Sequence, residues 1–322
     1  MVSPVSTADL AAINVVFSRD LIPRNLNNWV VYKFATLSKD IPQKSGQRIT
    51  YKKFTSLANA TTALVEGVTP AGKKPVATTQ NVDVSQYGDF IPFTDIFEIT
   101  QDSPDLQEFN KLLSEQSSDT YDVLTFTILG AGTSIRRANS RATRAEVLST
   151  DLPNTTDLRK CIRTLRAAKA KPIKKMLDGT PKYGTAPVGE AYVAFINSSA
   201  EYDIADLDGF VAVEEYSSKE GLVTGEIGKY KNIRFVRAEN VPTFTGLGDS
   251  GGDVDCAIIL AQDCFGITKI MGKGLESITH PIGSSGSNDP CNQRGSMGWK
   301  GYFAAAIIRQ ENMLRYEFAV SA

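Results

Sequence analysis

The last forty residues, Gly283 to Ala322, read GSSGSNDPCNQRGSMGWKGYFAAAIIRQENMLRYEFAVSA. A polar segment rich in turn-forming residues passes directly into two strand patterns, Trp299 to Ile308 and Met313 to Val320. Gln310, Glu311 and Asn312 lie between them and are predicted to form the turn. The chain is therefore expected to end in strands that close a sheet and not in a flexible tail.

The second of these strands has two different faces. Side chains alternate across a strand, so one face carries only apolar groups and the other carries Arg315 and Glu317. This alternation predicts a strand with its apolar face in the core. The apolar face consists of Leu314, Tyr316, Phe318 and Val320.

Three helices are predicted before this sheet. Ser103 as a cap and Pro104 in the first turn begin a helix of about 26 residues, roughly 40 Å long, which ends at Gly130 and Gly132. Its apolar stripe is expected to contain Leu106, Phe109, Leu113, Val123, Leu124 and Ile128. Another helix, capped by Thr156, is expected from Asp157 to about Ala170, with Leu158, Ile162 and Leu165 facing inward. A short amphipathic helix is also expected near the N-terminus, through about Arg19.

Residues 47 to 95 are predicted to form a long two-stranded hairpin. The first strand opens at Ile49 to Tyr51, and the second includes Asn81 to Ser85 with Val82 and Val84 on one face. The segment between them, Thr55 to Thr79, is rich in Thr, Ala, Gly and Pro and offers almost no apolar material for a core. A two-stranded hairpin is marginal on its own. It is expected to need another surface, which a neighbouring subunit would supply.

Short strand patterns fill much of the rest of the chain, with no regular alternation of strand and helix. This pattern indicates an α+β protein. The strands are expected at Ala191 to Ile196, Phe210 to Val213, Ile233 to Val236 and Asp255 to Leu260.

Several blocks, in the same order along the chain, resemble a known family. They are Ser85 to Asp95, Pro187 to Phe195 followed by Glu201 to Ile204, Gly225 to Gly228, Asn232 to Val236, and the C-terminal strands. Together they are similar to a tailed-bacteriophage major capsid protein of the Hong Kong-97-type fold, over nearly the whole chain.

The resemblance implies a domain organisation. Residues 1–40 would be an N-terminal arm, 41–95 the extended loop, 96–150 with 291–322 a peripheral domain containing the spine helix, and 151–290 an axial domain near the capsomer axes. Some family members begin with a long charged scaffold segment that is cut away. Here the arm starts at once, which implies a separate scaffold protein or none, and no processing.

The resemblance also implies a function and partners. The chain would be a structural protein without catalytic residues or cofactors, which assembles with itself as hexamers and pentamers into a shell around double-stranded DNA. Its other partners would be a scaffold protein, a portal and a cementing protein. It would be located in the virion capsid, after assembly in the cytoplasm of the bacterial host.

The alternative of another class is a serine hydrolase that uses Ser250 and His280. Gly248 to Gly252 reads GDSGG, which matches a protease nucleophile motif and Gly-x-Ser-x-Gly. A serine nucleophile needs a base, and His280 is the only histidine in the chain. The flanking residues favour a turn over the strand and helix that such a site requires, so the loop is predicted to be structural.

Basic residues gather in two clusters, Arg136 to Arg144 and Arg159 to Lys175. One interpretation is a patch that faces DNA phosphates without sequence preference. The other is a solvated helix face, or a patch that pairs with a neighbour's carboxylates such as Glu214, Glu215 and Glu220. The second interpretation is favoured, and the absence of interleaved aromatic residues argues against stacking on single strands.

Composition sets broad limits. The 322 residues carry 35 Lys and Arg against 36 Asp and Glu, so net charge favours no polyanionic partner. No apolar run has membrane-spanning length, and the N-terminus lacks a secretory signal. The four cysteines are widely spaced, which argues against a zinc site and favours reduced thiols; they are Cys161, Cys256, Cys264 and Cys291.

Overall fold

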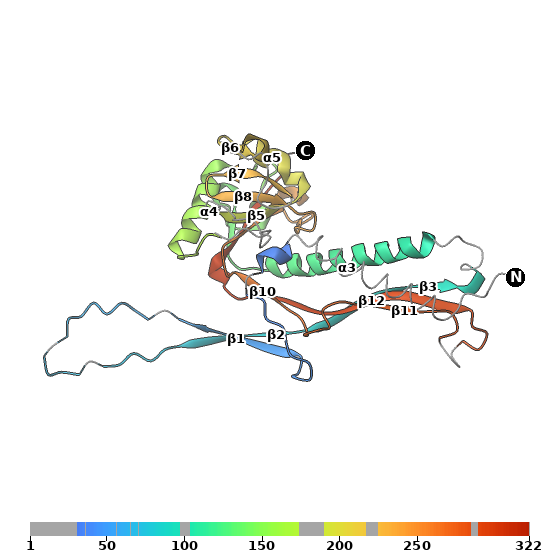
Figure 1. Ribbon diagram of the computed structural model, residues 1–322. Helices are drawn as coiled ribbons and strands as arrows, with labels where there is room; N and C mark the ends of the chain where they lie inside the picture. Colours follow the sequence, from blue (N-terminus) through green and yellow to red (C-terminus); the bar gives the residue numbers. More distant parts are fainter. Residues whose placement is uncertain are drawn as a thin grey trace.

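The computed structural model describes residues 31–35, 37–55, 57–64, 66–69, 71–96, 104–173, 190–216, 225–284 and 289–321, with no side-chain detail for 104–108. Figure 1 shows three parts: a sheet domain at the top, a long helix lying above a second sheet, and a hairpin that projects away from both. Helices and strands mix without regular alternation, which confirms the expected α+β class. The expected helix through Arg19 lies outside the described residues.

The sheet domain is built on seven strands collected from distant parts of the chain. Two neighbouring pairs, β13 with β4 and β5 with β8, are parallel, and the other pairs are antiparallel. The four strand patterns expected between residues 191 and 260 all lie in this sheet. In spatial order, its strands are β4 (Ile135–Arg137), β13 (Met313–Phe318), β9 (Asp255–Leu260), β5 (Tyr192–Ile196), β8 (Ile233–Arg237), β7 (Glu226–Tyr230) and β6 (Phe210–Ala212).

Helices cover both faces of this sheet. On one face, α4 (Thr155–Ala167) inserts Leu158, Ile162 and Leu165 into a core that also contains Ile204 of α5 (Glu201–Ala205). The opposite face packs against η1 (Val31–Phe34) and the end of α3 (Pro104–Gly130), where Phe126 is fully buried. The expected inward face of α4 is confirmed.

The expected cap of α4 was wrong. The capping residue is Asn154, whose side chain accepts the backbone N–H of Asp157 and donates to the Asp157 carboxylate. Thr156 lies inside the first turn. An amide at this position satisfies an N–H that has no partner within the helix, as a threonine would have done.

The long helix α3 has 27 residues, close to the expected length. Its expected stripe is partly wrong, because Val123 is exposed while Tyr121, Phe126 and Leu129 are buried. Leu113 is buried as expected, and Leu106 lies among the residues without described side chains. The helix is buried on different sides along its length because its end enters the sheet domain while its middle lies on the second sheet (Figure 1).

The second sheet is organised around β12 (Arg294–Ile307). Its first ten residues pair on one side with β3 (Ser85–Thr94), and β11 (Glu276–His280) lies on the other side. Its last four residues pair with β10 (Phe265–Thr268). The turn η8 (Gln310–Asn312) then leads into β13, which belongs to the seven-stranded sheet. Residues 291–322, which the sequence analysis placed in one domain, therefore contribute to both sheets.

The strand β12 begins at Arg294, five residues before the expected start. Gly295, Gly298 and Gly301 in this segment resemble turn signals but lie inside the strand. A Cβ atom on Gly298 would lie 2.7 Å from the Asp89 carbonyl oxygen, and one on Gly301 would lie 1.8 Å from the Tyr121 hydroxyl. Because these glycines have no side chain, α3 and β3 can approach the strand closely, which is a common reason for glycine inside a strand.

The hairpin consists of β1 (Arg48–Phe54) and β2 (Ala77–Asp83), with Arg48 opposite Asp83 and Phe54 opposite Ala77. The expected hairpin is confirmed over these residues. The expectation that it extends to residue 95 was wrong, since β3 pairs with β12.

Candidate subunit-contact surface

The hairpin exposes more large apolar side chains than any other described element. They lie at the end of β1 and along the loop that connects it to β2, where no other described part of the chain covers them (Figure 1). The exposed fractions are 65% for Phe54, 58% for Leu57, 77% for Leu64, 62% for Val68 and 63% for Val76. Apolar groups clustered on an element without a core mark an interaction surface.

The base of the hairpin is fixed to the rest of the molecule. The Tyr51 hydroxyl lies 2.9 Å from the Thr268 hydroxyl of β10, and the Lys53 ammonium pairs with the Glu311 carboxylate of η8. Val82 and Val84 are buried. The hairpin thus starts from a defined position, while its distal half has no contact with the sheets.

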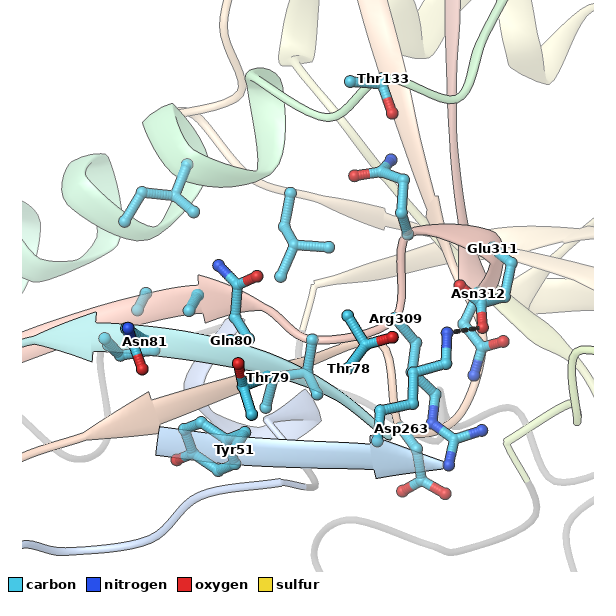
Figure 2. A pocket seen from close by; sticks show the side chains of 18 of the residues that line it. Tyr51, Thr78, Thr79, Gln80, Asn81, Thr133, Asp263, Arg309, Glu311 and Asn312 are labelled. Atoms are coloured by element: carbon cyan, nitrogen blue, oxygen red, sulfur yellow. Dashed lines mark hydrogen bonds and ion pairs between the residues drawn. The ribbon is translucent and has the colours of Figure 1, made fainter. Parts of the chain in front are cut away.

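A cleft of about 1110 Å³ lies between the hairpin base and the body. Figure 2 shows Tyr51, Thr79 and Gln80 of the hairpin on one side, with Thr133 above them and the turn containing Glu311 and Asn312 at the end. Lys169 and Lys171, which follow α4, also line this cleft. The lining combines polar side chains with apolar ones such as Ile128, Ile307 and Ile308.

The first basic cluster is used inside the molecule. Arg137 and Arg144 donate to the Glu317 carboxylate at 2.9 and 2.5 Å, and Arg315 donates to the same group at 2.9 Å. Arg141 pairs with the buried carboxylate of Asp151. These arginines are therefore structural, and the sequence interpretation of a patch available to DNA or a neighbour was wrong for them.

The Glu317 side chain is completely buried. Burial disfavours its charged form, but the guanidinium groups of Arg144, Arg315 and Arg137 outweigh this effect and hold the pKa of Glu317 below its usual value. A buried charge requires such partners, since an unpaired one is very costly. Sequence alternation placed Arg315 and Glu317 together on one face but gave no sign that this face is buried.

The second basic cluster is different. Arg159, Arg163 and Arg166 are exposed on α4, and Lys169 and Lys171 are exposed just beyond it. Arg159 donates to the Tyr230 hydroxyl at 3.1 Å. Within the described part of the chain, none of the five has an ion-pair partner. Lys174 and Lys175 lie outside the described residues.

Ser250 and His280 are not brought together. Ser250 lies in η6 (Asp249–Gly251) at a φ of 53°, and its hydroxyl donates to the adjacent Asp249 carboxylate at 3.0 Å. His280 ends β11 in the second sheet, opposite Ser296. Within the described residues no hydrogen bond joins the two side chains. The geometry does not place His280 as a base for Ser250, as expected for a structural turn.

The cysteines and acidic groups form no reactive or metal centre in the part of the chain that is described. Cys161, Cys256 and Cys264 are buried free thiols, and burial raises the pKa of each to about 12. Cys291 is an exposed free thiol. The described residues contain no group of three or more His, Cys, Asp and Glu side chains arranged for a metal. No described helix has both the length and the apolar character needed to span a membrane.

Comparison with known proteins establishes the fold. No family model and no curated protein matches the sequence. Among solved structures, the capsid of Ralstonia phage GP4 is 11% identical, with a TM-score of 0.69 over 88% of this chain and 87% of that one. The head structure of Helicobacter pylori bacteriophage KHP40 is also 11% identical, with a TM-score of 0.64 over 91% of both chains.

A third match is the holo-SrpI encapsulin complex from Synechococcus elongatus, which is 11% identical with a TM-score of 0.54 over 94% of this chain and 89% of that one. Each likeness spans most of both chains, so the shared architecture is global. The chain has the Hong Kong-97-type fold of tailed-phage capsid proteins, as the sequence resemblance implied.

Proposed function

We propose that this chain is the major capsid protein of a tailed phage and that it assembles with itself into an icosahedral shell around the DNA genome. The observation that carries this proposal is the projecting hairpin with its exposed apolar side chains, in a chain whose fold is that of capsid proteins. The role is structural and non-enzymatic.

Energetics support a second copy as the partner of the hairpin. Covering one large apolar side chain stabilises a complex by about 1.5–3 kcal/mol, and Phe54, Leu57 and Leu64 are all more than half exposed. A shell provides identical neighbours on every side, so each hairpin would meet the same surface of another subunit. The fold of the matched capsids is consistent with this use.

Domain assignments and further partners form part of the same proposal. We assign residues 41–83 to the extended loop, because 85–94 pair with β12. The second sheet with α3 would be the peripheral domain, and the seven-stranded sheet the axial domain near the axes of hexamers and pentamers. A separate scaffold protein, a portal and a cementing protein are expected partners, with DNA on the inner face and assembly in the host cytoplasm before release of the virion.

Electron microscopy and sedimentation velocity of the purified protein test the proposal. The expected result is closed shells, or rings of five and six subunits, whose abundance increases with protein concentration. The hydrolase alternative predicts that Ser250 reacts with a fluorophosphonate probe and that His280→Ala abolishes this labelling. A protein that is strictly monomeric at every concentration would contradict the proposal.

A further inference from the structure

The sheet domain carries a basic face whose members have no ion-pair partner among the described residues. We use this name for Arg159, Arg163, Arg166, Lys169 and Lys171, all of which are exposed. Arg159, Arg163 and Arg166 repeat at intervals of four and three residues and so share one side of α4. Arg166, Lys169 and Lys171 also line a hollow of about 400 Å³, together with Glu190, Tyr192 and Asn232.

The same domain carries an acidic edge. Asp206 and Asp208 precede β6, and Glu214 and Glu215 follow it in η5 (Val213–Glu215). All four are exposed, and β6 is the last strand of the sheet. Within the described ranges of the chain, none of these carboxylates takes part in an ion pair.

The two surfaces lie on different sides of the domain. In Figure 1, α4 runs down the left-hand side, whereas β6 and α5 lie at the top. One copy therefore cannot satisfy both surfaces within itself, but two copies related by a rotation can. A contact between two different surfaces of the same protein repeats from copy to copy, and it closes into a ring when the rotation allows.

We propose that the basic face of one subunit docks against the acidic edge of the next subunit around a ring. This inference rests on the proposed function and names the surfaces through which the sheet domains meet. The hollow beside Lys169 and Lys171 would receive carboxylate side chains of the neighbouring η5. Complementary charge at such a contact sets the register and the rate of association and rejects wrong neighbours.

A second copy fits the basic face better than DNA does. DNA duplexes meet even single protein modules over about 600 Å² or more of protein surface, whereas the hollow accommodates only a few side chains. Lys169 and Lys171 also line the cleft between the hairpin base and the body, so the basic face reaches the base of the hairpin. The acidic edge supplies the opposite charge, and its carboxylates also lack ion-pair partners among the described residues.

Charge reversal tests the docking. One variant carries Arg163→Glu, Arg166→Glu and Lys171→Glu, a second carries Asp208→Lys, Glu214→Lys and Glu215→Lys, and a third carries all six changes. Lys169 stays unchanged because its φ of 56° is unusual for a side-chain-bearing residue. A control variant carries Lys39→Glu and Arg294→Glu, two exposed residues outside both surfaces.

Each three-residue variant is expected to keep the wild-type melting temperature and to lose shell yield by about tenfold or more, measured on empty particles by electron microscopy. The six-residue variant should recover the yield because both surfaces change sign together. In a mixture of the two three-residue variants, rings of six with alternating copies satisfy every contact, whereas a ring of five must contain one contact between like copies. The mixture should therefore form hexamers, and the control should behave as wild type.

Normal yield from either folded three-residue variant would overturn the inference, as would folded protein without recovery in the six-residue variant. If basic-face reversal leaves empty shells intact and only reduces the nucleic acid retained in filled ones, the partner is DNA and the inference is wrong. Failure of the wild type itself to assemble would instead refute the proposed function.

Discussion

The seven-stranded sheet and the β1–β2 hairpin are stabilised in different ways. Every residue of β5, β9 and β13 is buried, and helices cover both faces of that sheet. The hairpin buries only Val82 among its strand residues. The sheet can therefore hold its shape within one subunit, whereas the distal hairpin needs a surface from outside. In the shell proposed above, this division would separate the folding of a subunit from its assembly.

The largest expected effect is on assembly and concerns the exposed apolar side chains of the hairpin. Changing Phe54, Leu57 and Leu64 to Ser should abolish shells while leaving the melting temperature of the subunit unchanged, because these side chains contact no core. Particle counts by electron microscopy and thermal unfolding of the unassembled protein measure the two effects. Leu247→Ser, which removes an exposed leucine elsewhere, serves as the control. An equal loss of shells in the control would contradict the claim that the exposed hairpin side chains form the contact between subunits.

A change at Glu317, in the buried sheet, is expected to reduce the stability of the subunit itself. Glu317→Gln should lower the free energy of unfolding by about 3–5 kcal/mol, because Arg137, Arg144 and Arg315 would keep their charges without a buried counter-charge. Denaturant unfolding of the subunit measures the change. Glu239→Gln, in an exposed pair with Arg237, should cost less than about 1 kcal/mol.

The effect of Glu317 should depend on pH. Its folded-state pKa is lowered, so the carboxylate contributes stability above the unfolded-state pKa and loses it as the pH falls through the folded-state value. The difference between wild type and Glu317→Gln should therefore shrink in acid. A difference that stays constant down to low pH would contradict this account of the cluster.

The smallest effect is expected at Asp122 of α3. Burial raises the pKa of Asp122 to about 6, and the nearby charge of Asp119 also raises it. Hydrogen bonds that Asp122 accepts from Asn240 and the Val31 amide act in the opposite direction and lower it. A raised pKa contributes stability that is complete below the unfolded-state pKa near 3.8 and is lost as the pH rises through about 6. Asp122→Asn keeps an acceptor without the charge, so its melting temperature should exceed that of wild type at pH about 7 and approach it near pH 4. A difference independent of pH would show that Asp122 is not the titrating group.

Local signals predicted much of the fold. Pro104 begins a helix of nearly the expected length, and alternation identified the core face of β13. The expected cap at Ser103 lies outside the described residues. The polar face of β13 was not recognised as buried because Arg137 and Arg144, which surround Glu317, lie more than 170 residues earlier in the chain. Gly295 and Gly298 were interpreted as part of a turn-rich segment because the close approach of β3 exists only in three dimensions.

The candidate surface was predicted only in part. The sequence correctly indicated a hairpin that is exposed in the isolated chain. The expectation that residues 55–79 carry almost no apolar material was wrong, because Leu57, Leu64 and Val68 lie in this segment and are exposed. Charge clusters did not distinguish the partly buried, ion-paired arginines near residue 140 from the exposed ones on α4. Sequence spacing gives only the position of a charge along the chain. Its ion-pair partner could not be predicted because it depends on which strands become neighbours in the fold.

Hydrogen–deuterium exchange on assembled particles and on dissociated subunits tests the central claim most directly. The account predicts that amides of β5, β9 and β13 exchange slowly in both samples, whereas amides of the hairpin exchange rapidly in subunits and slowly in particles. Hairpin amides that are equally protected in isolated subunits, or unprotected in assembled particles, would contradict it.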